Sequence, residues 1–154
     1  MRVPGQRSLP FRPRLGIVFL VAAAALAVVG SGAAVVRAQG RPQAGTALEP
    51  VMQQLEAFRR DDFDTAYGFA SAYIRQLFDR ASFERMVRAG YPEIARSSFA
   101  ALAEIREEPD GPVYLRLMIR GANGRSIEAV YEMVAEEGAW KINGVVARPS
   151  GTAA

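Results

Sequence analysis

The chain of 154 residues contains no cysteine and no histidine, and its only lysine is Lys141. The missing cysteines exclude disulfide bonds, and the absence of both residue types excludes zinc sites of the Cys/His kind. It also excludes a histidine general base and every Ser-His-Asp or Cys-His nucleophile, which removes the commonest proton carrier near neutral pH. The redox compartment stays open, because oxidising compartments also hold proteins without disulfides.

The basic charge of the chain is concentrated at its start. The formal net charge is +3. Residues 1–38 contain five arginines and no acidic residue, whereas residues 39–154 carry 14 basic and 16 acidic side chains. A domain that binds nucleic acid needs a basic face. The mildly acidic remainder of the chain therefore argues against a nucleic acid as its partner.

An uncharged apolar segment, residues 15–36, comes after four of these arginines. As a helix it would extend ~33 Å, enough to cross a hydrocarbon core of ~30 Å. Arginines before such a segment favour export of the residues after it. Val36-Arg37-Ala38 suits cleavage by a signal peptidase, although the run is longer than a usual signal core. Residues 1–38 are therefore a cleaved signal peptide or a retained membrane anchor, and both interpretations predict an extracytoplasmic domain, periplasmic or secreted.

Residues 39–45, QGRPQAG, have the composition of a flexible linker, and a series of short helices is predicted after them. Thr46 and Glu49 have the spacing of a capping box, which predicts a helix over residues 47–60. Shorter apolar stripes with helical spacing come next, at residues 63–70, 74–78 and 83–87.

The stretch FERMVRAGYPEI predicts the end of a helix that begins near residue 82, with Ser82 or Asp79 as its cap. Gly90 is expected to close this helix by adopting a positive φ. Pro92 disfavours helical geometry at Tyr91 and stops the helix there. Tyr91 is then left facing either the core or a cavity.

From residue 98 onward the hydrophobic period changes from helical to alternating, most clearly at residues 113–120. Turn signals separate four predicted strands, at residues 98–107, 113–120, 125–136 and 139–147. Helices succeeded by an antiparallel meander predict an α+β fold, with the helices packed on one face of a curved sheet. This domain is expected over residues 46–149, with a disordered tail at 150–154.

The sequence blocks AFRRDDFDTAYGFAS, IRQLF, FERMVRAGYP and GAWKINGVV resemble the bacterial family known as domain of unknown function 4864, over about residues 48–147. That family looks related to the nuclear transport factor 2-like superfamily, also called cystatin-like α+β. In such folds a strongly bent sheet wraps helices into a cone, often with a pocket at its open end. The resemblance implies a cone-shaped fold but no activity, because the function of the family is itself unassigned.

Four aromatic residues are the candidate ligand-binding residues: Tyr67, Tyr91, Tyr131 and Trp140. Aromatic side chains with polar tips often line small-molecule pockets whose walls are apolar. The alternative is that the same side chains pack the helices onto the sheet and form part of the core.

Other polar residues suggest chemistry less strongly. Asp61, Asp62 and Asp64 have the residue types of a carboxylate pair or a cation site, but calcium-loop spacing is missing, which favours a helix cap. Lys141 next to Trp140 is interpreted as a surface residue at a strand edge rather than as a nucleophile. No catalytic residue, metal site or cofactor is assigned.

The predicted strands also carry opposite charges. Arg116 and Arg120 lie opposite the aliphatic face of the second strand, and Glu128 and Glu132 share one face of the third. Cross-strand ion pairs on a solvated face are expected, each worth roughly 0.2–1 kcal/mol. An Arg–Glu pair inside the cone that orients a substrate is the alternative. The glycine-rich residues 121–124 precede a strand, so they predict a hairpin and not a phosphate loop.

Three functions remain open from the sequence. The first is an exported, non-catalytic module that binds a small apolar ligand or an envelope protein. The second is a lyase or isomerase that uses tyrosine and a carboxylate, as some members of the superfamily do. The third is a structural module that forms a homodimer through its exposed sheet face. An uncleaved leader would add contact with the membrane through residues 15–36.

Overall fold

The computed structural model describes residues 40–150. The predicted signal peptide or membrane anchor at residues 1–38 and residues 151–154 of the expected tail lie outside the described residues. Among the helices of residues 40–150, none is long and apolar enough to cross a membrane.

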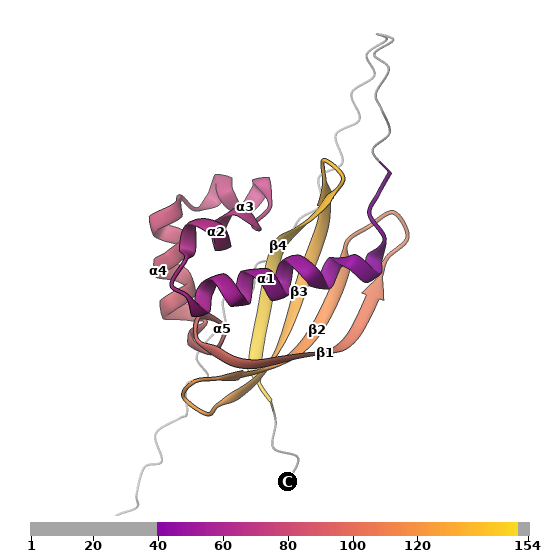
Figure 1. Ribbon diagram of the computed structural model, residues 1–154. Coiled ribbons are helices and arrows are strands. Elements are labelled where there is room, and N and C mark those ends of the chain that lie inside the picture. The colour runs from indigo at the N-terminus through magenta and orange to yellow at the C-terminus, as the bar shows by residue number, and fades with distance from the viewer. Residues whose placement is uncertain (1–39, 151–154) are drawn as a thin grey trace, which may run out of the picture.

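The predicted α+β fold is confirmed (Figure 1): short helices come first and are succeeded by a four-stranded antiparallel sheet in the order β1-β2-β3-β4. The helical part consists of a 3-10 helix η1 (Ala44–Ala47) and the α-helices α1 (Leu48–Arg59), α2 (Phe63–Gly68), α3 (Ala72–Leu77), α4 (Arg80–Gly90) and α5 (Pro92–Ala95). The strands are β1 (Ser97–Glu107), β2 (Val113–Gly121), β3 (Ser126–Glu136) and β4 (Ala139–Pro149).

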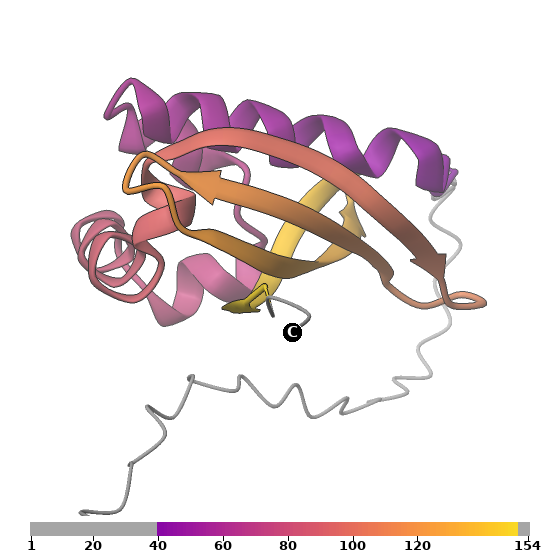
Figure 2. The ribbon, with the colours of Figure 1, turned by 90° about the horizontal axis from the view of Figure 1, so that it is seen from below.

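The sheet curves around α1 but does not close (Figure 2). Figure 1 shows α1 crossing in front of the strands, with α2, α3, α4 and α5 gathered at one end of it. The core lies between the helices and the sheet: buried and more accessible side chains alternate along β2, and along β3 as far as Met133, so that one face of the sheet is buried. The inward-facing residues of β2 are Val113, Leu115, Leu117 and Ile119, and all are buried as the period of two predicted.

The beginning of α1 differs from the prediction. Ala47 already has helical φ and ψ and serves as the N-cap without a side-chain hydrogen bond, so the predicted capping box at Thr46 is wrong. Thr46 lies inside η1, and its hydroxyl donates to the Gln43 carbonyl instead. The carbonyl of Gln43 also accepts a hydrogen bond of 3.0 Å from Trp140 Nε1. Part of the segment predicted as a linker thus contacts the domain.

The helix end at Gly90 also differs from the prediction. Gly90 is the last residue of α4 and does not have the positive φ expected of it, because Gly124 and Gly138 are the glycines with positive φ among the described residues. Tyr91 ends α4 with φ −135° and ψ 57°, and Pro92 then begins α5. The restriction that proline places on Tyr91 is therefore enough to end the helix.

The outer face of the sheet carries a row of alternating charges across all four strands. Arg116 lies 2.8 Å from Glu104 and 3.4 Å from Glu128, and Arg148 pairs with Glu128. The predicted cross-strand ion pairs are confirmed for Arg116 and Glu128. Glu132 instead accepts a hydrogen bond from Asn143. The charges therefore mark the solvated face of the sheet.

Replacing Gly121 by alanine is expected to destabilise the domain. A Cβ at this position would lie 2.7 Å from Asn123 Oδ1 and 3.0 Å from Glu93 Cα, which is backbone and cannot rotate away. Overpacking of this kind costs about 1–3 kcal/mol. Urea denaturation of the Gly121→Ala variant measures the change in the free energy of unfolding.

Gly90→Ala is the matched control for that variant. A Cβ at Gly90 meets nothing within 4 Å, and the residue lies in α4 without a positive φ. Because alanine has the higher helix propensity, this variant should be as stable as the parent or more stable by up to about 1 kcal/mol. An equal loss of stability in both variants would contradict the steric explanation at Gly121.

Asp79 is expected to contribute stability that disappears in acid. Its side chain caps α4 by accepting from the Ser82 amide at 2.6 Å, and this hydrogen bond lowers the pKa of the carboxyl below its ordinary value of 3.8. A carboxyl with a lowered pKa in the folded state stabilises above its unfolded pKa, and the contribution is lost as the pH falls through the folded pKa. Asp79→Asn keeps a cap acceptor without the charge, so its free energy of unfolding should fall less steeply between pH 5 and pH 2 than that of the parent. The same slope in both proteins would show that the charge of Asp79 does not matter.

Candidate apolar ligand cavity

A small cavity of ≈ 60 Å³ lies between the inner face of β3 and β4 and the short helices that come after α1. It is bounded by Gln54, Phe58, Ala70, Ile74, Phe78, Phe83, Met86, Val87, Tyr91, Ile94, Tyr131, Ile142, Gly144 and Val145. Among these described residues none carries a charged side chain. Along this part of the sheet the helical layer is divided among α3, α4 and α5, which have 6, 11 and 4 residues, whereas α1 is one continuous helix of 12 residues.

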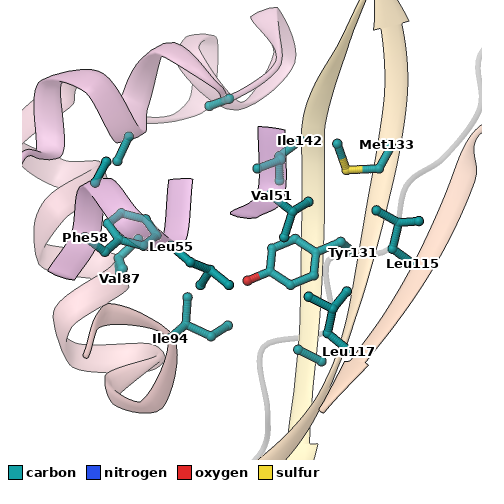
Figure 3. Close-up of a cluster of buried hydrophobic side chains, with 14 of the residues drawn as sticks. Val51, Leu55, Phe58, Val87, Ile94, Leu115, Leu117, Tyr131, Met133 and Ile142 are labelled. Carbon is teal, nitrogen blue, oxygen red and sulfur yellow. The ribbon is translucent and has the colours of Figure 1, made fainter. Parts of the chain in front are cut away.

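Tyr131 contributes the most unusual polar group of the cavity wall. It points inward from the middle of β3, and the whole residue is 1% exposed. Its hydroxyl has no hydrogen-bond partner and is directed toward the helical layer, near Leu55 and Ile94 (Figure 3). Burial raises the pKa of this phenol, and the neighbouring Tyr91 adds to the shift. The hydroxyl is therefore a neutral O–H donor at any physiological pH.

Tyr91 closes another side of the cavity. It lies at the junction of α4 and α5, where Pro92 prevents the helix from continuing. Its hydroxyl donates to the Val145 carbonyl of β4 at 3.3 Å, and burial raises its pKa as well. The stretch FERMVRAGYPEI thus ends one helix, begins the next and brings a tyrosine to the cavity wall between them.

The other two candidate aromatic residues are not part of this wall. Tyr67 donates its hydroxyl to the carbonyl of Phe78 at 2.6 Å, which holds the end of α3. Trp140 is buried near the start of α1, where Arg41 lies 5.4 Å from the centre of its ring. The structure therefore brings together Tyr91 and Tyr131 and separates them from Tyr67 and Trp140.

Gln54 and Gly144 are two of the twelve residues of the cavity wall that were not among the candidates from the sequence. Gln54 is buried on the apolar side of α1 and donates to the Ala66 carbonyl at 3.0 Å. Its place three residues after Val51 and four before Phe58, within an apolar stripe, was a signal that could have identified it. Gly144 lies in β4 beside the register shift between Glu132 and Met133, and a glycine in a strand is typical of such a bulge, so its sequence gave no signal of a cavity.

The acidic cluster near α2 has structural roles. Asp62 accepts from the Thr65 amide at 3.0 Å as the N-cap of α2, and that hydrogen bond lowers its pKa. Asp61 pairs with Arg88, and Asp64 with Arg80. Within residues 40–150 no group of acidic side chains is arranged to hold a metal ion. The cluster therefore caps a helix, as the sequence predicted.

Lys141 has a structural contact as well. Its exposed ammonium donates to the Gly68 carbonyl at 2.8 Å, on the outside of the domain. This places Lys141 away from the cavity and agrees with the surface role predicted for it.

The family model of a domain of unknown function (DUF4864) matches residues 42–153, which include all of the helices and strands described above. No curated protein and no solved structure matches the chain. The likeness to the nuclear transport factor 2-like superfamily therefore stays a prediction from the sequence.

Tyr131→Phe is expected to stabilise the domain, which is unusual for a substitution in a core. A buried hydroxyl without a partner costs about 1–3 kcal/mol, and phenylalanine removes it while filling the same space. Ser97→Ala should act in the same direction, because Ser97 Oγ is also buried without a partner. Chemical denaturation measures both changes. A loss of more than about 1 kcal/mol in Tyr131→Phe would mean that the hydroxyl is satisfied in the folded protein.

Proposed function

We propose that this chain, which belongs to the family of a domain of unknown function (DUF4864), binds a small, mostly apolar molecule in the cavity. The ligand carries one hydrogen-bond acceptor, which receives the Tyr131 hydroxyl. The observation that carries the proposal is this hydroxyl, buried and unpartnered in an otherwise apolar wall.

The chemistry of the wall favours a neutral ligand. Burying an ionised carboxylate requires a cation or several donors close to it, and the charged side chains of the domain lie elsewhere. A ketone, ester or alcohol needs a single donor, which Tyr131 supplies. The acceptor of such a ligand would receive the hydrogen bond that the Tyr131 hydroxyl does not make within the domain. This hydrogen bond would orient the ligand, and contact with the apolar wall would supply most of the affinity.

Binding is favoured over catalysis by the residues that accompany Tyr131. A lyase or isomerase needs a general base within reach of the reacting atom. The cavity wall offers tyrosines with raised pKa values and the amide of Gln54, and no carboxylate. The leader supports the further proposal that the domain acts outside the cytoplasm. A homodimer or an envelope protein as partner is the second candidate, supported by the exposed apolar side chains of Phe99, Leu102 and Ile105 on the edge strand β1.

The proposal predicts selective binding of 2-hexanone over hexanoate by the full-length chain. Both probes have the same carbon skeleton, but hexanoate would bring an ionised group into an uncharged cavity. The measurement is a titration followed by NMR, supported by the increase in melting temperature that a ligand of the native state produces. If hexanoate bound as tightly as 2-hexanone, this would contradict a cavity that selects neutral ligands.

Tyr131→Phe should weaken the binding of 2-hexanone by about 2- to 10-fold, which corresponds to one hydrogen bond. Ser97→Ala is the matched control: it also removes an unpartnered buried hydroxyl, but Ser97 does not line the cavity. This variant should bind like the parent. Equal affinity of the Tyr131→Phe variant and the parent would rule out the hydroxyl as the ligand's donor.

A further inference from the structure

Gln54 is a buried amide in the wall of the cavity that contains Tyr131. It is 4% exposed and lies in the apolar stripe of α1, between Val51 and Phe58. Burying an amide is unfavourable unless its polar atoms are hydrogen-bonded, and an apolar side chain at this position would carry no such cost. The glutamine therefore needs an explanation for each of its polar atoms.

The contacts of Gln54 within the domain account for its nitrogen but not for its oxygen. Nε2 donates to the Ala66 carbonyl of α2 at 3.0 Å, and the same carbonyl also accepts from the Phe69 amide at 3.3 Å. Because a carbonyl only accepts, the NH₂ branch of Gln54 must face α2, and Oε1 lies on the other branch of the planar group. Within residues 40–150 no donor bonds this oxygen. The amide is thus fixed by its nitrogen and keeps an unused acceptor.

Gln54 and Tyr131 offer complementary groups to the same cavity. The Tyr131 hydroxyl is a donor without an acceptor, and Gln54 Oε1 is an acceptor without a donor. They come from the two layers of the domain, α1 and β3, and they do not bond each other. Around them the wall is mostly apolar, with side chains such as Phe58 and Ile94. A molecule in the cavity satisfies both groups only if it accepts one hydrogen bond and donates another.

From this pair we infer that the polar group of the ligand accepts from the Tyr131 hydroxyl and also donates to Gln54 Oε1, an inference that rests on the proposed function. A ketone or an ester has no donor and leaves Gln54 Oε1 unpaired. A hydroxyl or a primary amide has both a donor and an acceptor. A site built to bond an O–H or N–H group rejects the analogue that lacks it, because its own polar atoms then stay unpaired. The ligand class therefore narrows to small apolar alcohols and amides, and Gln54 is the residue that selects them.

Tyr91 is the competing acceptor in the wall. Its hydroxyl donates to the Val145 carbonyl at 3.3 Å, and its oxygen keeps the capacity to accept. An amide oxygen is the stronger acceptor, since its two lone pairs are free and its carbonyl is polarised by the nitrogen. We therefore assign the role to Gln54, and the variants below separate the two residues.

The test compares three probes of equal size, 2-hexanone, 2-hexanol and pentanamide, titrated by NMR into the full-length chain. The alcohol replaces the carbonyl of the ketone by a hydroxyl, and the amide replaces its methyl group by NH₂. At least one of these two donor-bearing probes should bind about 3- to 10-fold more tightly than 2-hexanone, which corresponds to one further hydrogen bond. If 2-hexanone binds at least as tightly as both, the inference is overturned and the proposed function stands. If none of the three binds, the proposed function fails and the inference fails with it.

Gln54→Met removes the acceptor and keeps a flexible side chain of similar length. The preference over 2-hexanone should disappear in this variant, because the donor of the ligand then meets no acceptor. Gln53→Met is the matched control, since Gln53 is the preceding residue of α1, is exposed and bonds Glu49 at 3.0 Å. It should keep the preference of the parent.

A preference that survives in Gln54→Met would place the acceptor elsewhere, for example at Tyr91, and would overturn the role assigned to Gln54. If Gln54→Met does not fold, Gln54→Leu takes its place, because leucine suits the apolar stripe of α1 and the Ala66 carbonyl keeps its bond from the Phe69 amide. The comparison of the three probes on the parent protein needs neither variant.

Discussion

The inward-facing side chains of β2 and β3 pack against α1, and the rest of the domain is arranged around this contact. Leu115 and Leu117 on β2, Tyr131 on β3, and Val51 and Leu55 on α1 form its centre (Figure 3). Because successive side chains of a strand point to opposite faces, a shift of the register by one residue would expose this entire set. The sheet can bend around α1 only while the two layers stay in contact along it.

The cavity results from the incomplete cover that the rest of the helical layer provides. Beyond α1 the chain turns back in four helices, each of which begins at a side-chain cap (Asp62, Ser71, Asp79) or at a proline (Pro92). The edge of β4 is covered there by a local contact, in which Ser71 donates its amide to the Ile142 carbonyl and Ile142 donates to the Phe69 carbonyl. This contact holds α3 against the edge and leaves the space beneath it open. The Tyr131 hydroxyl points toward Leu55 of α1 and Ile94 of α5, where apolar side chains surround it and no acceptor lies within hydrogen-bond distance.

The outer face of the sheet carries charged side chains, and the inner face is apolar. The row from Glu104 through Arg116 and Glu128 to Arg148 lies on the outer face, where water screens each pair and limits its contribution to stability. The inner face is uncharged, so a donor such as the Tyr131 hydroxyl acts there without competition from water or ions. The β4 edge is the place where the two environments meet, and Gly144 and Glu132 lie at that border.

The sequence alone determined the order of the elements, because helical and strand periods, capping residues and turns depend on neighbours within a few positions. Asp79 as a cap, Pro92 as a helix terminator and the alternating side chains of β2 could be recognised in this way. Local patterns failed at Thr46, which lies inside η1 instead of capping α1, and at Gly90, where Pro92 ended the helix without a positive φ at the glycine. Only the tertiary structure decided that Tyr91 and Tyr131 line the same cavity, that Tyr67 and Trp140 lie elsewhere, and that the hydroxyls of Tyr131 and Ser97 have no partner. Those outcomes depend on distances between residues that are remote in the chain, and hydrophobic periodicity carries no information about them.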